Sequence, residues 1–276
     1  SISGLRATTQ DCLSNEIIHK YIYSFNEVCP EGTIILGRDG RPTGKKIEDE
    51  VISILDALDR DVIVLGVVPT PTVQLFVEKL KAAGGIAITA SHNPAEWNGL
   101  KFINKKGIFF DSKENFELWK IVDNFEKINF FKNEESGAEF ITNAIEEHIN
   151  SILKLEIFKE SNIVNRIKER QFKIVVDAVN SSGSIAIPTL LARLDSCFVP
   201  LYCDGTGIFP HTPEPLPVNL SELSKAVVEN NADLGIAVDP DADRLVLIGE
   251  DGITIGEEKT IALAAYSVLS SAYCDK

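Results

Sequence analysis

Methionine is absent from this chain of 276 residues, although a globular chain of this size ordinarily carries several. Spacings inside short motifs are therefore more informative than distances between remote segments, because methionines left out of the sequence would shorten the long distances. Cysteine is scarce, and its five residues form no C-x-x-C pair. This pattern argues against a zinc site and against a disulfide framework, and it favours reduced thiols in a cytoplasmic protein.

Basic residues are also in short supply. There are 27 Lys and Arg against 41 Asp and Glu, which gives a formal net charge of −14. Such a surface argues against nucleic-acid partners and against anionic membranes, since both attract a net positive protein. A local anion pocket built from a few arginines remains compatible with this charge. No apolar run is long enough to cross a membrane, and no signal-peptide pattern is found.

Apolar residues are plentiful, and their periodicity alternates between strand and helix. At 44% hydrophobic, the chain can fill more than one core, so we expect two domains rather than one. In the first half, short buried runs at 33–37, 61–66 and 86–89 predict strands, and 100–104 with 108–110 predicts a hairpin. Amphipathic stretches at 43–58, 72–83 and 114–125 predict helices between and after them.

The second half repeats this alternation. A polar connection at 132–138 is followed by one long predicted helix over 141–157. Strands are predicted at 172–177, 197–202, 234–238 and 244–248, and helices at 183–194 and 220–230. The fold class is therefore α/β, with two related three-layer α/β/α domains whose sheets are mixed but mostly parallel. We place these domains at 1–138 and 139–252.

A short internal repeat supports the relation between the two domains. The letters G-I-A-I begin at Gly85 and G-I-A-V begin at Gly235, an offset of 150 residues. Each run follows a predicted helix and leads into a polar loop, and in this register Ser91 falls opposite Asp241. Four matched letters are weak evidence alone, but the matched context predicts a duplicated α/β unit. Ligands of α/β sheets gather at the carboxyl ends of strands, where both loops lie.

The second of these loops, D-P-D-A-D-R, concentrates negative charge. Asp239, Asp241 and Asp243 alternate along an extended turn, so their carboxylates can converge and would repel one another without a cation. The alternative is an acidic turn that is exposed to solvent and binds no metal. An EF-hand calcium loop fails, because Arg244 stands at the sixth position where Gly is needed. Three carboxylates suit Mg²⁺ and leave a coordination position for a phosphate oxygen. The adjacent Arg244 could hold that phosphate.

The first loop, T-A-S-H-N-P, offers a hydroxyl, an imidazole and an amide in succession. The Ser91 hydroxyl is a weak nucleophile alone, but once phosphorylated it provides a metal ligand and a transferable group. His92 and Asn93 either donate hydrogen bonds or brace the loop. Hydrolase chemistry is a poor alternative, because adjacent Ser and His side chains seldom face each other and no G-x-S-x-G elbow is present.

Three further segments carry cations suited to an anion. Arg6 lies in S-G-L-R-A, and Arg38 with Arg41 lies in G-R-D-G-R-P-T-G, a glycine-rich loop that is not a Walker motif. Lys101 follows Gly99, where backbone can approach a ligand closely. Each of these cations, taken alone, is as well explained by a solvated surface position.

Taken together, S-G-L-R-A, G-R-D-G-R-P-T-G, T-A-S-H-N-P-A-E-W-N-G-L-K-F and D-P-D-A-D-R resemble the α-D-phosphohexomutases, the phosphoglucomutase/phosphomannomutase family. The resemblance extends in order over essentially the whole chain. It implies a phosphoserine at Ser91 in domain 1 and a magnesium ion bound by that phosphate together with the aspartates of domain 2. It also implies catalytic roles for Lys101 and Arg6, and substrate contacts from Arg244, His92 and Arg41.

The implied reaction moves a phosphoryl group between C1 and C6 of a hexose phosphate, glucose or mannose, through a bisphosphate intermediate. Glucose 1,6-bisphosphate or a similar compound is the implied activator. Phosphoglucosamine mutase is the alternative within the same class. A non-catalytic module that binds a metal or a sugar phosphate is the alternative of another class. The intact Ser91, Lys101 and three aspartates argue against it.

Residues 253–276 resemble the beginning of the family's third domain. We therefore expect an incomplete fragment with little turnover, whose partners are its own C-terminal domains and a hexose phosphate. One departure from the family pattern is Ala7, where the family commonly has Gly.

Overall fold

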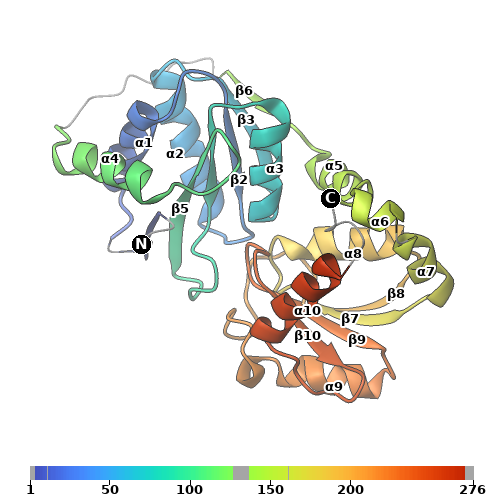
Figure 1. Cartoon of the computed structure of the whole chain (residues 1–276). Coiled ribbons are helices and arrows are strands. Elements are labelled where there is room, and N and C mark those ends of the chain that lie inside the picture. The colour runs from blue at the N-terminus through green and yellow to red at the C-terminus, as the bar shows by residue number, and fades with distance from the viewer. Residues whose placement is uncertain (1–3, 11, 127–136, 161, 271–276) are drawn as a thin grey trace. The chain divides into compact units, whose positions relative to one another are not determined.

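The computed structural model describes residues 4–10, 12–126, 137–160 and 162–270 (Figure 1). The chain divides into two compact units, residues 1–144 and residues 145–276. Within the described residues no helix combines the length and the apolar character needed to cross a membrane.

The first unit is built on a sheet with the strand order β1-β5-β4-β2-β3-β6. The adjacent strands β4, β2, β3 and β6 run parallel to one another, whereas β5 is antiparallel to both β4 and β1. Consequently the carboxyl ends of β2 and β4 lie at one edge, where β5 begins. The strands span β1 Leu5–Thr8, β2 Ile34–Arg38, β3 Val62–Val67, β4 Gly84–Ile88, β5 Trp97–Asn104 and β6 Ala138–Phe140.

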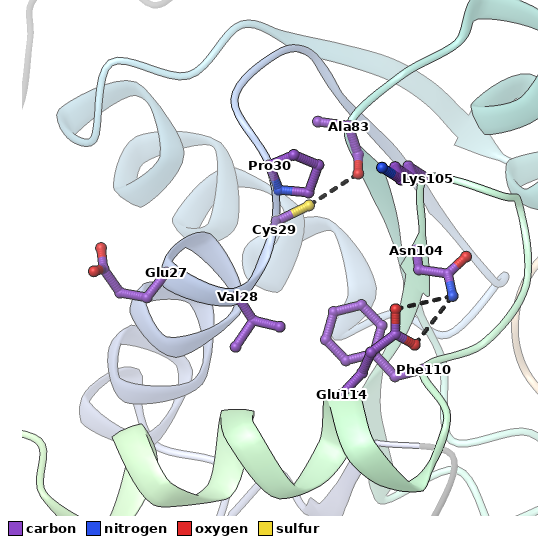
Figure 2. A pocket seen from close by; sticks show the side chains of 9 residues that line it. All are labelled: Glu27, Val28, Cys29, Pro30, Ala83, Asn104, Lys105, Phe110 and Glu114. Carbon is purple, nitrogen blue, oxygen red and sulfur yellow. Dashed lines mark hydrogen bonds between the residues drawn. The ribbon is translucent and has the colours of Figure 1, made fainter.

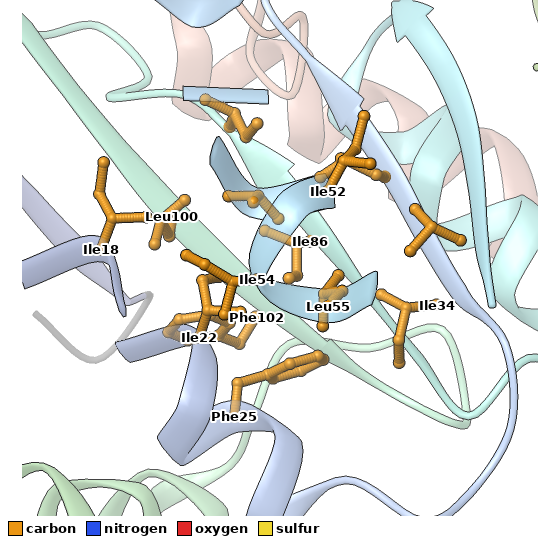
Figure 3. Packing of buried hydrophobic residues seen from close by; sticks show 14 of the residues in the cluster. Ile18, Ile22, Phe25, Ile34, Ile52, Ile54, Leu55, Ile86, Leu100 and Phe102 are labelled. Atoms are coloured by element: carbon orange, nitrogen blue, oxygen red, sulfur yellow. The ribbon is translucent and has the colours of Figure 1, made fainter. Parts of the chain in front are cut away.

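Helices cover both faces of this sheet (Figure 1). On one face lie α1 (Asn15–Val28), α2 (Gly44–Ala57) and α4 (Ser112–Asp123), and on the other lies α3 (Thr70–Leu80). The first three pack into a core that includes Phe25, Leu55, Ile86 and Phe102 (Figure 3). On the opposite face α3 lies close to the sheet at Gly37, because a Cβ there would be 2.6 Å from Val73 Cγ2.

The second unit has the strand order β10-β9-β7-β8, in which only β10 is antiparallel. Side chains of β7 alternate between the faces: Val175 packs with Val227 of α9, and Val176 packs with Leu191 of α8. The elements are β7 Lys173–Asp177, α8 Gly183–Arg193, β8 Cys197–Leu201, the 3₁₀ turn η1 Pro217–Asn219, α9 Ser221–Glu229, β9 Leu234–Val238, β10 Leu245–Gly249 and α10 Glu257–Leu269. The predicted α/β class, with two α/β/α domains and mixed, mostly parallel sheets, is confirmed.

The two sheets share a common part, which agrees with the predicted internal repeat. The order β5-β4-β2-β3 in the first unit corresponds to β10-β9-β7-β8 in the second, with the same sequence of one antiparallel and two parallel pairings. The letters G-I-A-I and G-I-A-V occupy the equivalent strands β4 and β9. The loop of Ser91 and the loop of Asp241 therefore leave equivalent strands.

The long helix predicted over 141–157 is wrong. Two shorter helices overlap this range, α5 (Ala144–Leu153) and α6 (Glu156–Glu160), and a third, α7 (Ile163–Arg170), follows it. Ile141 is not helical because its N–H continues the pairing of β6 by donating to the Val64 carbonyl. At the far end, Lys154 and Leu155 bond three residues back, which closes α5 with a tight turn.

Other differences are smaller. The predicted second hairpin strand, 108–110, forms just an isolated bridge between Ile103 and Phe109. The strands β1 and β6 and the helix α1 were not predicted. Most of the predicted connection at 132–138 lies outside the described residues.

Candidate functional site

Ser91 lies on the loop that leaves the carboxyl end of β4, and its backbone is left-handed, with φ of 51°. A non-glycine residue in this conformation carries strain that its surroundings must offset. Part of the compensation is local, because the Ser91 N–H donates to Thr89 Oγ1 at 2.8 Å. The residue is buried, and its Oγ lies 3.4 Å from His92 Nδ1. The loop thus holds one strained hydroxyl in a defined position.

Arg41 occupies the centre of this loop and is fully buried. All five of its guanidinium N–H groups are used, one on a carboxylate and four on backbone carbonyl oxygens of the loop. The acceptors are Asp39 Oδ2 (3.0 Å) and the carbonyls of Ser91 (2.6 Å), Asn93 (2.7 Å), Pro94 (2.6 Å) and Trp97 (3.1 Å). The substrate contact expected of Arg41 does not fit this geometry, because the side chain spends its donors inside the protein.

Asp39 connects Arg41 to Thr89, which lies between the end of β4 and Ser91. Its Oδ1 accepts the Arg41 N–H at 3.0 Å, and its Oδ2 accepts the Thr89 hydroxyl at 2.7 Å. The ion pair with Arg41 is completely buried on both sides. Removing either charge from such a pair would strand the other in the interior. Sequence reasoning missed both Asp39 and Thr89, although an acid directly after a buried strand was a usable signal.

Arg6 reaches the same loop from β1. Its Nη1 donates to Asn93 Oδ1 at 3.3 Å, and its backbone pairs with Gly99 of β5. A Cβ at Gly99 would lie 2.2 Å from the Leu5 carbonyl oxygen, so a glycine is needed for β1 to approach β5 here. The structure therefore brings Arg6, Arg41, Ser91 and His92 together at one edge of the first sheet.

Lys101 lies farther along β5, opposite Ala87 of β4. Its side chain is buried, with 2% of the residue exposed, and Nζ stands 5.5 Å from the ring centroid of Phe109. Burial at this level is uncommon for a lysine, whose side chain is usually exposed. Lys101 thus lies buried on β5, the strand that directly follows the Ser91 loop.

In the second unit, the three predicted aspartates converge at the carboxyl end of β9. One carboxylate oxygen from each of Asp239, Asp241 and Asp243 lies within 4.8 Å of the others. The first two are buried, whereas Asp243 is exposed. The turn is closed by Asp239 Oδ1, which accepts the N–H groups of Asp243 and Arg244, each at 3.2 Å.

This donor set fits a small, hard divalent cation. Mg²⁺ takes six oxygen ligands at about 2.0–2.1 Å, which places ligand oxygens about 3–4 Å from one another. Three carboxylate oxygens within 4.8 Å need a small adjustment to reach that geometry. They leave coordination positions for water or for a phosphate oxygen. Carboxylates this close together repel one another when they are ionised, and a cation between them would offset that repulsion.

Arg244 stands between two acids beside this cluster. Its Nη1 lies 4.0 Å from Glu214 Oε1 and 3.8 Å from Glu257 Oε2, and about a third of its side chain is exposed, 32%. These separations are long for ion pairs, so the guanidinium keeps access to solvent. The predicted substrate contact of Arg244 is compatible with this position.

Comparison with known proteins agrees with these observations. The sequence profile of phosphoglucomutase/phosphomannomutase alpha/beta/alpha domain I matches residues 2–129, and that of domain II matches residues 146–252. A protein of Thermococcus kodakarensis named phosphoglucomutase/phosphomannomutase is 37% identical over 237 residues, which cover 86% of this chain and 50% of the relative. One of Pyrococcus horikoshii, named probable phosphoglucosamine mutase, is 33% identical over 265 residues, 95% of this chain and 56% of the relative.

The fold is found in solved structures as well. The crystal structure of a phosphoglucomutase/phosphomannomutase family protein from Burkholderia thailandensis superimposes with a TM-score of 0.78 at 26% identity, over 98% of this chain and 58% of that one. The chain spans about half the length of the curated relatives it matches. Two successive domain profiles cover most of the sequence in the order of its two units, and the chain therefore belongs to the phosphoglucomutase/phosphomannomutase family.

Proposed function

We propose that this chain supplies the phosphoryl-carrying and metal-binding domains of a phosphohexomutase. The observation that carries the proposal is the Ser91 loop: a strained serine on a loop that a buried Arg41 holds through four carbonyl oxygens. A loop that had merely to turn would not need this arrangement. The convergent aspartates of the second unit give the second requirement of phosphoryl transfer, a place for a divalent cation.

The proposed reaction transfers a phosphoryl group from phosphorylated Ser91 to one hydroxyl of a hexose phosphate. The Ser91 Oγ–P bond breaks, a new P–O bond forms on the sugar, and the sugar hydroxyl gives up its proton. The resulting bisphosphate then returns its other phosphoryl group to Ser91, so that phosphate has moved between C1 and C6. Mg²⁺ held by Asp239, Asp241 and Asp243 would neutralise phosphate charge during transfer.

Two cations of the first unit have proposed roles in this sequence. Lys101, buried on β5, would accept or return the proton of the sugar hydroxyl. Arg6, whose guanidinium reaches Asn93 of the same loop, would stabilise charge on the transferring phosphoryl group. His92, also in the first unit, would donate a hydrogen bond to the substrate. In the second unit, Arg244 would hold the non-reacting phosphate of the sugar.

The sugar itself is the finer part of the proposal. We propose glucose or mannose phosphate, with glucose 1,6-bisphosphate or a similar compound as the activator that first loads Ser91. Phosphoglucosamine is the second candidate, favoured by the name of the relative from Pyrococcus horikoshii. Initial rates of the whole protein on the three sugar phosphates, with trace bisphosphate and Mg²⁺, decide between them through the ratio of kcat/KM values.

Because the chain covers about half of its relatives' length, we propose that these 276 residues alone bind metal and carry phosphate but turn over slowly. A robust steady-state rate from this chain alone would contradict that part of the proposal without touching the rest.

The phosphoserine is tested directly. The protein is incubated with glucose 1,6-bisphosphate and Mg²⁺, and the phosphorylated peptide is located by mass spectrometry. We expect one phosphate on the peptide that contains Ser91 and none in the Ser91→Ala variant. A label that persists in Ser91→Ala, or a wild-type protein that takes up no phosphate, would refute the proposed function.

A further inference from the structure

The contacts of Arg41 point to a role other than substrate binding. Four carbonyl oxygens between Ser91 and Trp97 face its guanidinium at 2.6–3.1 Å, and its fifth donor is committed to Asp39. A guanidinium has five N–H groups and no more. Every one of them therefore has an acceptor within the protein, and none remains in position for a phosphate.

The geometry of this loop depends on those bonds. The Ser91 carbonyl accepts one of the two shortest of them, at 2.6 Å, and Ser91 is the loop residue held with φ of 51°. A single cation that draws in the carbonyls of residues 91, 93, 94 and 97 fixes the direction of several peptide planes at once. Carbonyl oxygens turned toward a phosphoserine would repel its negative charge, whereas these four are committed to a buried cation.

We propose that Arg41 is a positioning residue for phosphoryl transfer: it holds the Ser91 loop in the conformation that presents Oγ, and it does not contact the sugar phosphate. Asp39 and Thr89 complete the device, since Asp39 Oδ2 receives both Arg41 Nε and the Thr89 hydroxyl, and Thr89 Oγ1 receives the Ser91 N–H. This inference deepens the proposed function and rests on it.

The first unit contains a matched control, Arg60. It also makes five hydrogen bonds, which go to the Asn26 side chain and to the carbonyls of Asn26, Cys29, Pro30 and Gly32. These residues precede β2, whereas Ser91 follows β4, and the two strands are parallel. Arg60 therefore braces a loop by the same chemistry at the opposite edge of the sheet, away from Ser91.

The experiment compares Arg41→Lys with Arg60→Lys in the whole protein. Lysine keeps the charge but offers three donors in place of five, so each variant loses part of its network. The rate at which Ser91 takes up a phosphoryl group is measured over a range of glucose 1,6-bisphosphate concentrations. For Arg41→Lys we expect the maximal rate to fall by roughly 100-fold, the cost of a misplacement of about 1 Å, with little change in the half-saturating concentration. Arg60→Lys should lower the thermal midpoint but keep the maximal rate.

Thr89→Val provides a second variant if Arg41→Lys fails to fold. It is nearly isosteric, keeps the Asp39–Arg41 pair, and removes the hydroxyl that links this pair to the Ser91 N–H. We expect a loss of maximal rate in the same direction, roughly tenfold. Hydrogen exchange of residues 89–97 should accelerate in Thr89→Val and in Arg41→Lys, and should stay at the wild-type rate in Arg60→Lys.

The outcomes separate this inference from the function on which it rests. A raised half-saturating concentration with an unchanged maximal rate in Arg41→Lys would overturn the inference and restore Arg41 as a substrate ligand. Equal losses in Arg41→Lys and Arg60→Lys would also overturn it, because general destabilisation would then explain both. If wild-type Ser91 takes up no phosphate while exchange in 89–97 responds as expected, the proposed function fails and the positioning of the loop by Arg41 stands.

Discussion

His211 lies between Asp177 and the carbonyl of Thr212, so that each of its ring nitrogens faces an oxygen atom. Nε2 lies 2.8 Å from Asp177 Oδ2, and Nδ1 lies 2.8 Å from the carbonyl oxygen of Thr212. Neither acceptor has a proton to share when Asp177 is ionised, so the arrangement fits the imidazolium form. Asp177 ends β7 as Asp39 follows β2, and each carboxylate also accepts the N–H two residues ahead. His211 thus pairs with Asp177 in the second unit as Arg41 pairs with Asp39 in the first.

This pairing predicts a pH dependence of stability. Burial acts to lower the pKa of His211, but the hydrogen bond and the charge of Asp177 outweigh it, and the pKa is raised. A raised folded-state pKa gives stability that is complete below the unfolded value of about 6.5 and is lost as the pH rises through the folded value. We therefore expect wild-type protein to exceed His211→Gln by about 1–2 kcal/mol in free energy of unfolding at low pH, and by less above the folded pKa.

Urea unfolding of both proteins between pH 5.5 and 8.5 checks this prediction. Differences between the two proteins cancel the contribution of His148, whose pKa is lowered by burial and which therefore acts with the opposite sign. A gap that stays constant with pH would mean that His211 is neutral in the folded protein.

The repeat gives a prediction about packing. A Cβ at Gly85 would lie 2.7 Å from Val77 Cγ2, and a Cβ at Gly235 would lie 2.7 Å from Val227 Cγ2, with both members of the pair displaced by the same 150 residues. Valine cannot rotate away cheaply, so we expect Gly85→Ala and Gly235→Ala each to destabilise the protein by about 1–3 kcal/mol.

The midpoint of urea unfolding measures this effect, and Gly137→Ala is the control. At Gly137 the nearest atom to a new Cβ would be 4.0 Å away, so its unfolding midpoint should stay close to that of the wild type. Adding Val77→Ala to Gly85→Ala relieves the close contact, so the double variant should show a smaller loss than the two single losses added together. If the losses of stability in the two single variants simply add in the double variant, Val77 of α3 does not limit the space at residue 85.

Much of this fold follows from apolar periodicity. Strands such as β7 and β9 and helices such as α8 and α9 were predicted within a few residues, because each buries a regular stripe against the sheet. The prediction of a helix at 141–157 failed at both ends, because the Ile141 N–H pairs with Val64 and because a tight turn at Lys154 and Leu155 interrupts the helix. The apolar spacing of a segment does not reveal which strand pairs with it in the folded protein.

The candidate site divides in the same way. Ser91 and the three aspartates are recognisable because few structural needs place such groups directly after buried strands. The contacts of Arg41 could not be predicted, because a sequence does not show whether an arginine in a glycine-rich loop faces a ligand or backbone of its own chain. Four of its five acceptors come from residues 91–97, so the answer depends on contacts with residues 50 to 56 positions away in the chain.

The cysteines are predicted to react in two classes. Cys29 is buried and donates to the Ala83 carbonyl at 3.1 Å, and both residues line a pocket of about 450 Å³ (Figure 2). Burial raises its pKa to about 12, and burial raises that of Cys203 to about 11. The thiolate is the reactive form, so both should alkylate slowly at pH 8, whereas the exposed Cys12 and Cys197 should react readily.

Peptide mapping after a timed pulse of iodoacetamide distinguishes the two classes. The test is best made in Cys274→Ser, because Cys274 lies outside the described residues and would add an unassigned background. Fast labelling of Cys29 in folded protein would show that its pocket opens and that the thiol ionises more readily than its burial implies.

The aspartate cluster predicts measurable metal binding without any turnover. Asp241 is buried, with 1% exposed, and one of its carboxylate oxygens lies within 4.8 Å of those of Asp239 and Asp243. Asp241→Asn keeps the shape but removes one charge from a site that needs net negative charge to hold Mg²⁺. We expect its Kd for Mg²⁺, measured by calorimetry, to rise by at least about tenfold, since each 1.4 kcal/mol of lost attraction is a factor of ten. Glu250→Gln removes an exposed acid beyond β10 and should bind as the wild type does.

Chelation by EDTA should lower the thermal midpoint of wild-type protein and leave that of Asp241→Asn nearly unchanged, because a ligand stabilises the fold that binds it. Without metal, Asp241→Asn should be the more stable protein, since one buried repulsion is gone. If both variants bind equally well, the cation lies elsewhere.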